Sequence, residues 1–316
     1  MSASVVASGK FSWAALRESV LTQVSADSLP KSIELPALPH AVSEFVSKSG
    51  DPNVEIPVLA AIIEKDSALT VELLRFANSA SVAAKAPVRS VREAISQLGI
   101  NNSKTHLLAA GVKAASRAMK SRLINQRNFW NESLQRGLFA REVARRLKLD
   151  SGLAFLGGLL QDYLLPVLTN HFDREYLHYL DTGYAEGQCL VEWERETFGW
   201  DHASAGATLA ARWNFPNELL CAIYYHHSLP TVLERPEREF FSIFPVALAG
   251  LLPDQLRQMR DGFHELIRVD GLCRQIALEE TCKVVDDQQM QMAEGYEIPN
   301  HLSRMLEESR RIVAHH

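Results

Sequence analysis

A long apolar run at residues 153–168, LAFLGGLLQDYLLPVL, constrains this chain more than any other segment. A stretch so poor in polar side chains belongs in the core of a folded domain. Asp162 nevertheless stands inside the run, with Gln161 beside it. Burying an unpaired carboxylate costs several kcal/mol or forces the group to take up a proton. The fold must therefore bring a partner to Asp162, and a metal ion, a histidine and backbone donors are the alternatives.

Helical periodicity dominates the remaining sequence, and no segment shows the alternation of a half-buried strand. Three prolines in residues 25–40 indicate an extended connection. Residues 230–239 are charged and contain proline, which indicates a loop, and an apolar segment follows at 240–252. We predict an all-α fold, with helices at 11–24, 41–49, 58–64, 68–78, 90–98, 104–119, 128–147, 190–198, 202–213, 217–226 and 301–313.

Several of these helices carry their own start and stop signals. Ser90 and Glu93 have the spacing of a capping box, and Gly99 is placed to end that helix in the left-handed conformation. Asp201 is a natural N-cap, and Asn78 is a natural C-cap. The pair of glycines at 157 and 158 indicates close helix packing.

Composition excludes several classes of protein. The net charge of −5 gives no global basic surface and argues against nucleic acid as a partner. Four cysteines show neither a CxxC pair nor a zinc-ligand spacing, as expected of reduced thiols in a cytosolic protein. We expect no run that approaches the roughly 18 residues of a membrane span. The chain is expected to be soluble and cytoplasmic, with no contact to a membrane.

Seven segments together resemble the HDOD family, the HD-related output domain of bacterial signalling proteins. Any one segment alone is weak, but they follow the order found in the family. They are LPALP (35–39), IIEKDSALTVELLRFANSA (62–80), VREAISQLG (91–99), FWNES (129–133), FLGGLLQD (155–162), FGWDHASAGATLAARWNFP (198–216) and IYYHH (223–227).

The resemblance implies a helical N-terminal half packed on a half that looks like an HD-type metal-dependent phosphohydrolase. Active HD enzymes hold metal with an early His, a His-Asp pair and a late Asp. In this sequence Glu132 stands where the early His would be, and Gln161 replaces the His of the pair while Asp162 remains. The late Asp would fall near Gly250. The accessory histidines of binuclear members match His202 and one of His226 and His227.

These replacements argue against a catalytic metal, which needs three or more protein ligands and an open position. We therefore predict no catalytic residue, no metal and no cofactor. We also predict that Asp162 is buried and accepts a hydrogen bond from His202, from His226 or from backbone. Since neighbouring helical residues point about 100° apart, only one of His226 and His227 is expected to face Asp162, and His226 is preferred. On this reading Asp162→Ala costs about 1–3 kcal/mol and Asp162→Asn costs less.

The resemblance favours a non-catalytic signalling protein that acts on protein partners or changes shape with a ligand. A small molecule or nucleotide in the remnant pocket formed by Glu132, Gln161, Asp162, His202, His226 and His227 stays open as an alternative. A divergent metal-dependent phosphohydrolase acting on a nucleotide or cyclic dinucleotide is the competing hypothesis. No receiver domain is recognised, so the input is expected to arrive through a partner. The expected parts are an N-terminal helix and linker (1–28), an N-terminal bundle (29–125), a degenerate HD-like half (126–252) and a C-terminal helical extension (253–316).

Overall fold

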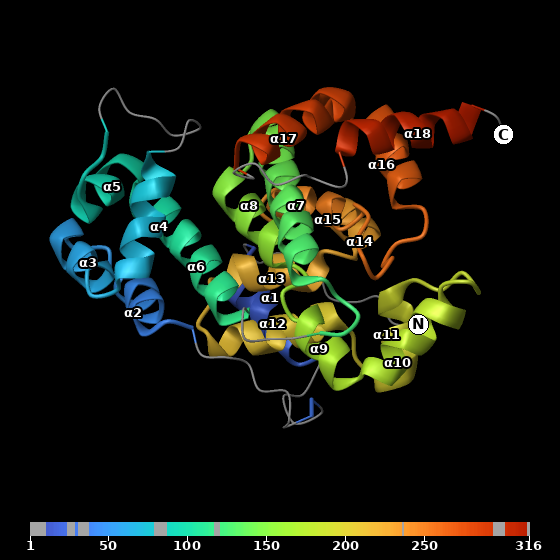
Figure 1. Ribbon diagram of the computed structural model, residues 1–316, viewed down its shortest axis with the longest axis horizontal. Coiled ribbons are helices and arrows are strands. Elements are labelled where there is room, and N and C mark those ends of the chain that lie inside the picture. The colour runs from blue at the N-terminus through green and yellow to red at the C-terminus, as the bar shows by residue number, and fades with distance from the viewer. Residues whose placement is uncertain are drawn as a thin grey trace.

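The computed structural model describes residues 11–23, 29–30, 38–78, 87–116, 121–235, 237–292 and 301–314. Within these ranges every regular element is helical, and none of the described residues forms a strand. The all-α prediction is therefore confirmed. Figure 1 shows the blue and teal helices of residues 40–116 gathered at one end, beside a larger green-to-red group that also holds the dark blue helix of residues 13–21. Most of the expected proline-rich connection lies outside the described residues.

The first group is a small bundle whose apolar faces meet in a continuous core. Phe45, Leu59, Leu73 and Ile95 contribute fully buried side chains from four different helices. The last helix of the group, α6, also packs against α8 and so joins the bundle to the rest of the molecule. The group comprises α2 (His40–Lys48), α3 (Ile56–Ile63), α4 (Ser67–Ala77), α5 (Val91–Leu98) and α6 (Ile100–Ser116).

The second group is built around two long, closely packed helices, α7 and α8. A Cβ atom at Gly158 would lie 2.6 Å from the carbonyl oxygen of Arg136 on α7. A Cβ atom at Gly157 would lie 2.6 Å from a methyl group of Val246. The two glycines permit this close packing, as the sequence predicted. The core of the group comprises α7 (Gln126–Leu147), α8 (Ser151–Leu160), α12 (His202–Arg212), α13 (Asn217–Tyr225) and α15 (Phe244–Ala249).

Shorter helices surround this core, and several were not predicted. The expected loop at 230–239 is wrong in its first half, because Leu229–Glu234 is helical. Pro230 lies in the first turn of this helix, where its missing N–H breaks no helical hydrogen bond. Pro166 lies in the first turn of the helix Leu165–His171 in the same way. The shorter helices are α1 (Trp13–Leu21), which packs on α12 and α13, with α9 (Leu165–His171), α10 (Asp173–His178), α11 (Leu190–Phe198) and α14 (Leu229–Glu234). A π-helical turn (Tyr179–Gly183) and a 3₁₀ turn (Phe240–Ile243) complete them.

The C-terminal part folds back onto the second group, as predicted. Leu302 and Leu306 are buried, and Met305 is partly buried against the core. The side chain of Gln289 accepts a hydrogen bond from Gln135 of α7 at 3.0 Å. This part contains α16 (Gly262–Leu272), a 3₁₀ turn (Arg274–Ile276), α17 (Leu278–Met292) and α18 (Leu302–Ala314).

Two helix-end predictions need correction. The hydroxyl of Ser90 accepts from the Glu93 N–H at 3.1 Å, but the Glu93 carboxylate accepts from the Arg89 N–H at 2.8 Å and so does not close a capping box. Gly99 does have a positive φ of 79°, but its ψ of 158° is extended rather than left-handed helical. The reason is that α6 starts at the very next residue and the chain must change direction. Asn78 caps α4 as predicted, and Ser79 lies outside the described residues.

The prediction about the length of the apolar run also needs correction. Residues Ser151–His171, which comprise α8, α9 and the turn between them, span 21 residues and contain an 18-residue window with a mean hydropathy of 1.3, enough by length and composition to cross a membrane. The expectation that no run approaches that length is therefore wrong. Within the molecule, however, 78% of the apolar window is buried. This burial is typical of a core helix in a soluble domain.

Candidate functional site

Asp162 lies in the turn that joins α8 to α9. The helix α8 ends at Leu160, and the carbonyl of Asp162 accepts a hydrogen bond from the N–H of Leu165 at 3.0 Å as α9 begins. The side chains of Asp162 and Gln161 are each only 2% exposed. The predicted burial of Asp162 is confirmed. The turn, rather than a continuous helix, directs its carboxylate into the space between α7 and the histidines.

The main partner of Asp162 is Arg136, which the sequence analysis did not single out. One guanidinium nitrogen of Arg136, Nη1, lies 3.2 Å from Asp162 Oδ2. The other, Nη2, lies 3.0 Å from Asp254 Oδ2 and donates to the Leu252 carbonyl at 2.9 Å. Burial alone would raise the pKa of Asp162, but Arg136 and the nearby histidines hold that pKa well below its usual range. An internal cation thus bridges the two buried carboxylates.

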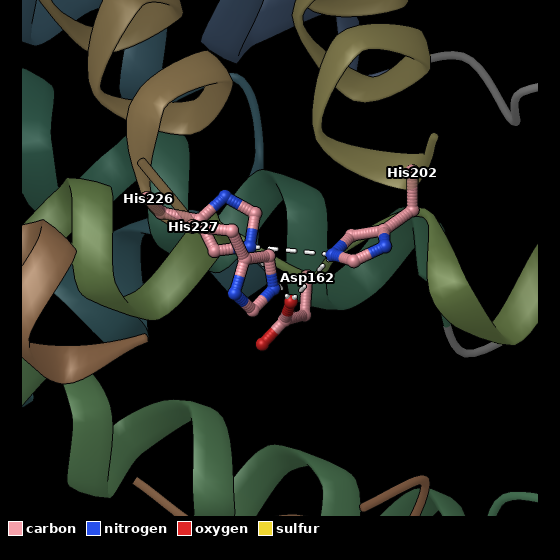
Figure 2. A group of neighbouring side chains, drawn as sticks. All are labelled: Asp162, His202, His226 and His227. Atoms are coloured by element: carbon pink, nitrogen blue, oxygen red, sulfur yellow. Dashed lines mark hydrogen bonds and ion pairs between the residues drawn. The ribbon is translucent and has the colours of Figure 1, made fainter. Parts of the chain in front are cut away.

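Two histidines approach the other oxygen of Asp162 (Figure 2). The Nε2 atoms of His202 and His226 lie 3.4 Å and 3.3 Å from Asp162 Oδ1, and 3.3 Å from each other. Both residues are 1% exposed. Both predicted histidines lie beside Asp162, but the predicted hydrogen bond is not formed with good geometry, because the contacts are longer than a charge-assisted hydrogen bond of about 2.7–2.9 Å. Asp162 Oδ1 in fact has no hydrogen bond of good geometry.

Each of these histidines is held from behind by an acceptor at Nδ1. Glu194 Oε2 lies 2.7 Å from Nδ1 of His202 and also accepts the backbone N–H of that residue at 2.8 Å. Tyr176 donates to the other oxygen of Glu194 at 2.6 Å. Nδ1 of His226 lies 2.6 Å from the carbonyl oxygen of Ile223. Burial would lower the pKa of His202, but Glu194 and Asp162 raise it to about 10.

His227 joins the same group, which corrects the expectation that only one of the two adjacent histidines would face Asp162. Ligand atoms of Asp162, His202, His226 and His227 all lie within 4.8 Å of one another. Both residues follow Tyr225, the last residue of α13, and their ring centroids lie only 4.0 Å apart. The Nε2 atom of His227 lies 2.9 Å from Gln258 Oε1, and its Nδ1 atom is buried without a hydrogen-bond partner. Burial holds the pKa of His227 well below its usual range.

The two replaced positions behave differently. Gln161 stays at the site, where its amide donates to Asp162 Oδ2 at 3.3 Å while its carbonyl oxygen is buried without a partner. Glu132 does not join the histidines and accepts instead from Gln255 at 3.3 Å. It lines a small cavity of about 10 Å³ together with Arg136 and Asp254. Burial is the main cause that raises the pKa of Glu132 to about 7, although Arg136 opposes it.

Three charged residues with buried side chains at this site escaped the sequence analysis, namely Arg136, Glu194 and Asp254. The expected late Asp was placed near Gly250, where a Cβ atom would lie 2.4 Å from the carbonyl oxygen of His226. No side chain fits there. Asp254, four residues later, instead pairs with Arg136 at 3.0 Å. The i,i+4 spacing of Glu132 and Arg136 on α7 was the one available signal for the arginine. Nothing in the sequence separates Glu194 from the other glutamates of α11.

Comparison with known proteins gives one family match. The HDOD domain model matches residues 35–229, which is more than half of the chain. An uncharacterized protein of Treponema pallidum (strain Nichols) is 28% identical over 235 residues. The match covers 73% of this chain but only 44% of that relative, so this chain spans less than half of the relative's length.

Solved structures share the fold. An HDOD domain protein of unknown function from Geobacter sulfurreducens is 19% identical with a TM-score of 0.57, and the match covers 95% of this chain and 94% of that one. A protein from Shewanella amazonensis SB2B, named provisionally a phosphohydrolase, is 23% identical with a TM-score of 0.63, covering 86% and 98%. A protein from Marinobacter aquaeolei VT8, named provisionally for signal transduction, is 20% identical with a TM-score of 0.59, covering 88% and 65%.

Proposed function

This chain belongs to the HDOD family, and we propose that it is a non-catalytic signalling protein that acts through contacts with a protein partner. The name of the Marinobacter aquaeolei relative places that protein in signal transduction, which supports the same role here. The cytoplasm is the compartment that fits four free cysteines and a signalling role.

The observation that carries the proposal is the position of Arg136. In the HD-type enzymes that the sequence resembles, a metal ion would sit between the Asp of the pair and the late Asp. Here the guanidinium of Arg136 contacts Asp162 at 3.2 Å and Asp254 at 3.0 Å. An arginine cannot lose its proton at physiological pH and cannot activate water as a Lewis acid. Both carboxylates are thereby paired with a cation that supplies no hydrolytic chemistry.

Lack of room beside these carboxylates also supports the proposal. Arg136, Asp162, His202 and His226 are at most 2% exposed. The cavity next to Arg136 measures about 10 Å³, which is about the space of one water molecule. Ligand pockets for small molecules usually measure about 300–1,000 Å³. A nucleotide therefore has no space next to Arg136 in this conformation.

The alternative function is a metal-dependent phosphohydrolase. It is favoured by the convergence of Asp162, His202, His226 and His227, and by the provisional name of the Shewanella amazonensis relative. Arg136 and Gln161 weigh against it, because they occupy positions where a catalytic centre needs a metal and a histidine ligand.

A hydrolysis assay tests the proposal. Purified protein is incubated with nucleotides and cyclic dinucleotides in the presence of Mg²⁺, Mn²⁺, Fe²⁺ or Zn²⁺, and we expect no turnover above the metal-only background. Metal-dependent turnover that disappears in an Asp162→Ala variant would overturn the proposal. A pull-down from the native cell with the full chain as bait should, in parallel, enrich a signalling protein.

A further inference from the structure

We infer that Asp162, His202, His226 and His227 bind one divalent transition-metal ion of the zinc type, in a closed site beside Arg136. The ion would be structural or regulatory rather than catalytic, so this inference goes beyond the proposed function and does not depend on it. The sequence analysis predicted no metal, because it considered only a catalytic centre. The sequence could not show where the lone pairs of the histidine nitrogens point.

The first argument is that four acceptors converge with no donor between them. Nδ1 of His202 and Nδ1 of His226 face a carboxylate and a carbonyl, so each must carry a proton. Nε2 of His227 faces the amide oxygen of Gln258 and must carry a proton for the same reason. The neutral imidazoles therefore present lone pairs at His202 Nε2, His226 Nε2 and His227 Nδ1. Asp162 Oδ1 supplies the fourth acceptor of the group.

An added proton would provide a donor for only one of these four acceptors. A second proton on His202 would satisfy one acceptor, either Asp162 Oδ1 or His226 Nε2. Asp162 Oδ1 and His227 Nδ1 are both buried without a hydrogen bond of good geometry. Buried polar atoms without partners are rare and costly. A cation at the centre of the group would satisfy the three atoms of the Asp162, His202 and His226 triangle at once, and His227, whose ligand atom lies within 4.8 Å of the others, would complete the site by moving closer.

The second argument is the size of the triangle formed by three of these atoms. The distances are 3.3 Å between the two Nε2 atoms, and 3.4 Å and 3.3 Å from these atoms to Asp162 Oδ1. A tetrahedral ion with bonds of about 2.0–2.1 Å holds neighbouring ligand atoms about 3.3–3.4 Å apart. The triangle therefore has the edge lengths of a tetrahedral zinc site. An octahedral ion with similar bonds would need edges of about 3.0 Å.

The third argument is the supporting shell behind the ligands. Histidine ligands usually donate their second N–H to a carboxylate or a carbonyl, which fixes the ring and its tautomer. Glu194 serves His202 in this way at 2.7 Å, and the Ile223 carbonyl serves His226 at 2.6 Å. Gln258 accepts from His227 at 2.9 Å. All three rings are thus oriented before any ion binds.

Formal charge supports the same conclusion. Asp162, Asp254 and Glu194 carry buried carboxylates in contact with this cluster, and Arg136 pairs with two of them. With the imidazoles neutral, as metal ligands are, two negative charges remain to be offset, and without an ion a proton on His202 offsets only one of them. A divalent ion on the histidine side of Asp162 offsets them. Four protein ligands leave no open position for water, which is the mark of a structural site rather than a catalytic one.

Metal analysis of the full chain tests the inference. Protein purified without added metal should contain about one divalent ion per chain. After removal of that ion with a chelator, Zn²⁺ should raise the melting temperature by roughly 5 °C at a hundredfold excess over the dissociation constant. Substitution with Co²⁺ should give the intense visible bands of a tetrahedral ion. Less than about a tenth of an equivalent, with no Zn²⁺ shift and no Co²⁺ bands, would overturn the inference.

Variants locate the ion. His202→Gln and His227→Gln should each weaken Zn²⁺ binding at least 10–100-fold, and His264→Gln, which removes a half-exposed imidazole, should not. Glu194→Gln, a positioning change, should weaken binding by about 10–100-fold without removing a ligand. Two variants at different ligands guard against one that fails to fold. Unchanged affinity in a folded His202→Gln protein would place the ion elsewhere and sink the inference.

The outcome for the ion and the outcome for hydrolysis are separable. Bound Zn²⁺ with no turnover supports both proposals. Bound Zn²⁺ with turnover keeps the metal site and overturns the non-catalytic function. Absence of any ion, together with absence of turnover, overturns the metal site alone.

Discussion

Arg136 is the residue on which the buried polar cluster depends most. It is 2% exposed and pairs with Asp162 and Asp254 at 3.2 Å and 3.0 Å. Removing one partner of a buried ion pair strands the other charge, and this loss is larger than the net value of the pair. The cluster therefore adds little net stability to the fold, but it disfavours local arrangements that would leave one of these charges unpaired.

Arg136→Met should destabilise the protein by about 3–5 kcal/mol, because two buried carboxylates lose their cation. Urea unfolding monitored by circular dichroism measures the change. Arg145→Met on the same helix is the matched control, since that side chain is 63% exposed and its loss should cost no more than about 0.5 kcal/mol. A loss below about 1 kcal/mol for Arg136→Met would contradict this account.

Because Arg136 is the main partner of Asp162, the loss of unfolding free energy in Asp162→Ala should lie at or above the upper end of the 1–3 kcal/mol expected from the sequence.

Glu132 should make stability depend on pH. Its pKa is raised from 4.5 to about 7, so between these values the folded state holds a proton that the unfolded chain has released. The stabilising contribution is complete below about pH 4.5 and is lost as the pH rises through 7. Glu132→Gln should therefore gain about 1–3 kcal/mol over the parent at about pH 8 and little at about pH 5. Urea unfolding at both values measures this gain.

Exposed Glu186 provides the control for that experiment. Glu186→Gln should show the parent's pH dependence, because water solvates this side chain in both states. Equal stabilisation by Glu132→Gln at both pH values would show that removal of the carboxylate acts through packing rather than through its proton.

At the residue scale, the sequence showed that Asp162 needs a buried partner, but it did not show that Arg136 is the main one. A carboxylate inside an apolar run has to be buried and paired, which pointed to Asp162 and to His202 and His226. The choice of Arg136 depends on how α7 lies against α8, and hydrophobic periodicity carries no such information. The directions of Nε2 and Nδ1 depend on Glu194, Ile223 and Gln258, which lie far from Asp162 in sequence.

At the scale of single helices, the crossing of α7 and α8 positions both Arg136 and Asp162. Gly158 faces the Arg136 carbonyl so closely that a Cβ atom would lie 2.6 Å from it. Backbone cannot yield as a flexible side chain does, so an added methyl group must separate the helices. The glycine thereby fixes the distance between the guanidinium and the carboxylate.

Gly158→Ala should destabilise the protein by about 1–3 kcal/mol through overpacking, in excess of the roughly 1 kcal/mol that alanine gains in a helix. Gly271→Ala on α16 is the matched control, because nothing lies within 4 Å of the added Cβ atom. That variant should be more stable than the parent by about 0.5–1 kcal/mol. Thermal unfolding of both proteins measures the difference, and stabilisation by Gly158→Ala would refute the close crossing.

The helices that sequence reasoning found share a clear apolar stripe and a cap, such as α4 behind Asp66 or α12 behind Asp201. Among those that it missed, α9, α10 and α14 are short, and α9 and α14 begin with a proline that looks like a breaker. The longer α16 and α17 were expected only as part of the helical extension at 253–316. In α9 and α14 the proline lies in the first turn, where it favours the helix. Sequence alone could not distinguish a proline that ends a helix from one that starts it.

At the scale of the whole molecule, the candidate site belongs entirely to the second group of helices. The first helix, α1, packs on α12 and α13, which hold His202 and lead to His226. The proposed division at residues 28, 125 and 252 stays a prediction. What the fold does show is that α1 contacts α12 and α13 of this group, and that α17, which carries α18, contacts α7. A partner that moved α1 would act on the elements that carry the histidines.

The C-terminal helix α18 is attached through Asp286 of α17. Its carboxylate accepts from the backbone N–H groups of Leu302 and Ser303 at 2.8 Å and 2.9 Å, and from the Ser303 hydroxyl at 2.6 Å. It thereby caps the first turn of α18 from another helix. A helix of 13 residues is marginal in water on its own, so its order depends on this cap and on the burial of Leu302 and Leu306.

Asp286→Ala should therefore release α18 while leaving the rest of the fold in place. Loss of a cap costs about 0.5–2 kcal/mol, so amide exchange in residues 302–314 should become roughly 2–30-fold faster, while exchange in α7 and α8 is unchanged. Hydrogen exchange followed by mass spectrometry measures this directly. Asp287→Ala, at the exposed neighbouring position, removes the same charge without removing the cap and should leave α18 protected. Unchanged protection of α18 in Asp286→Ala would mean that burial of Leu302 and Leu306 alone holds the extension against the second group of helices.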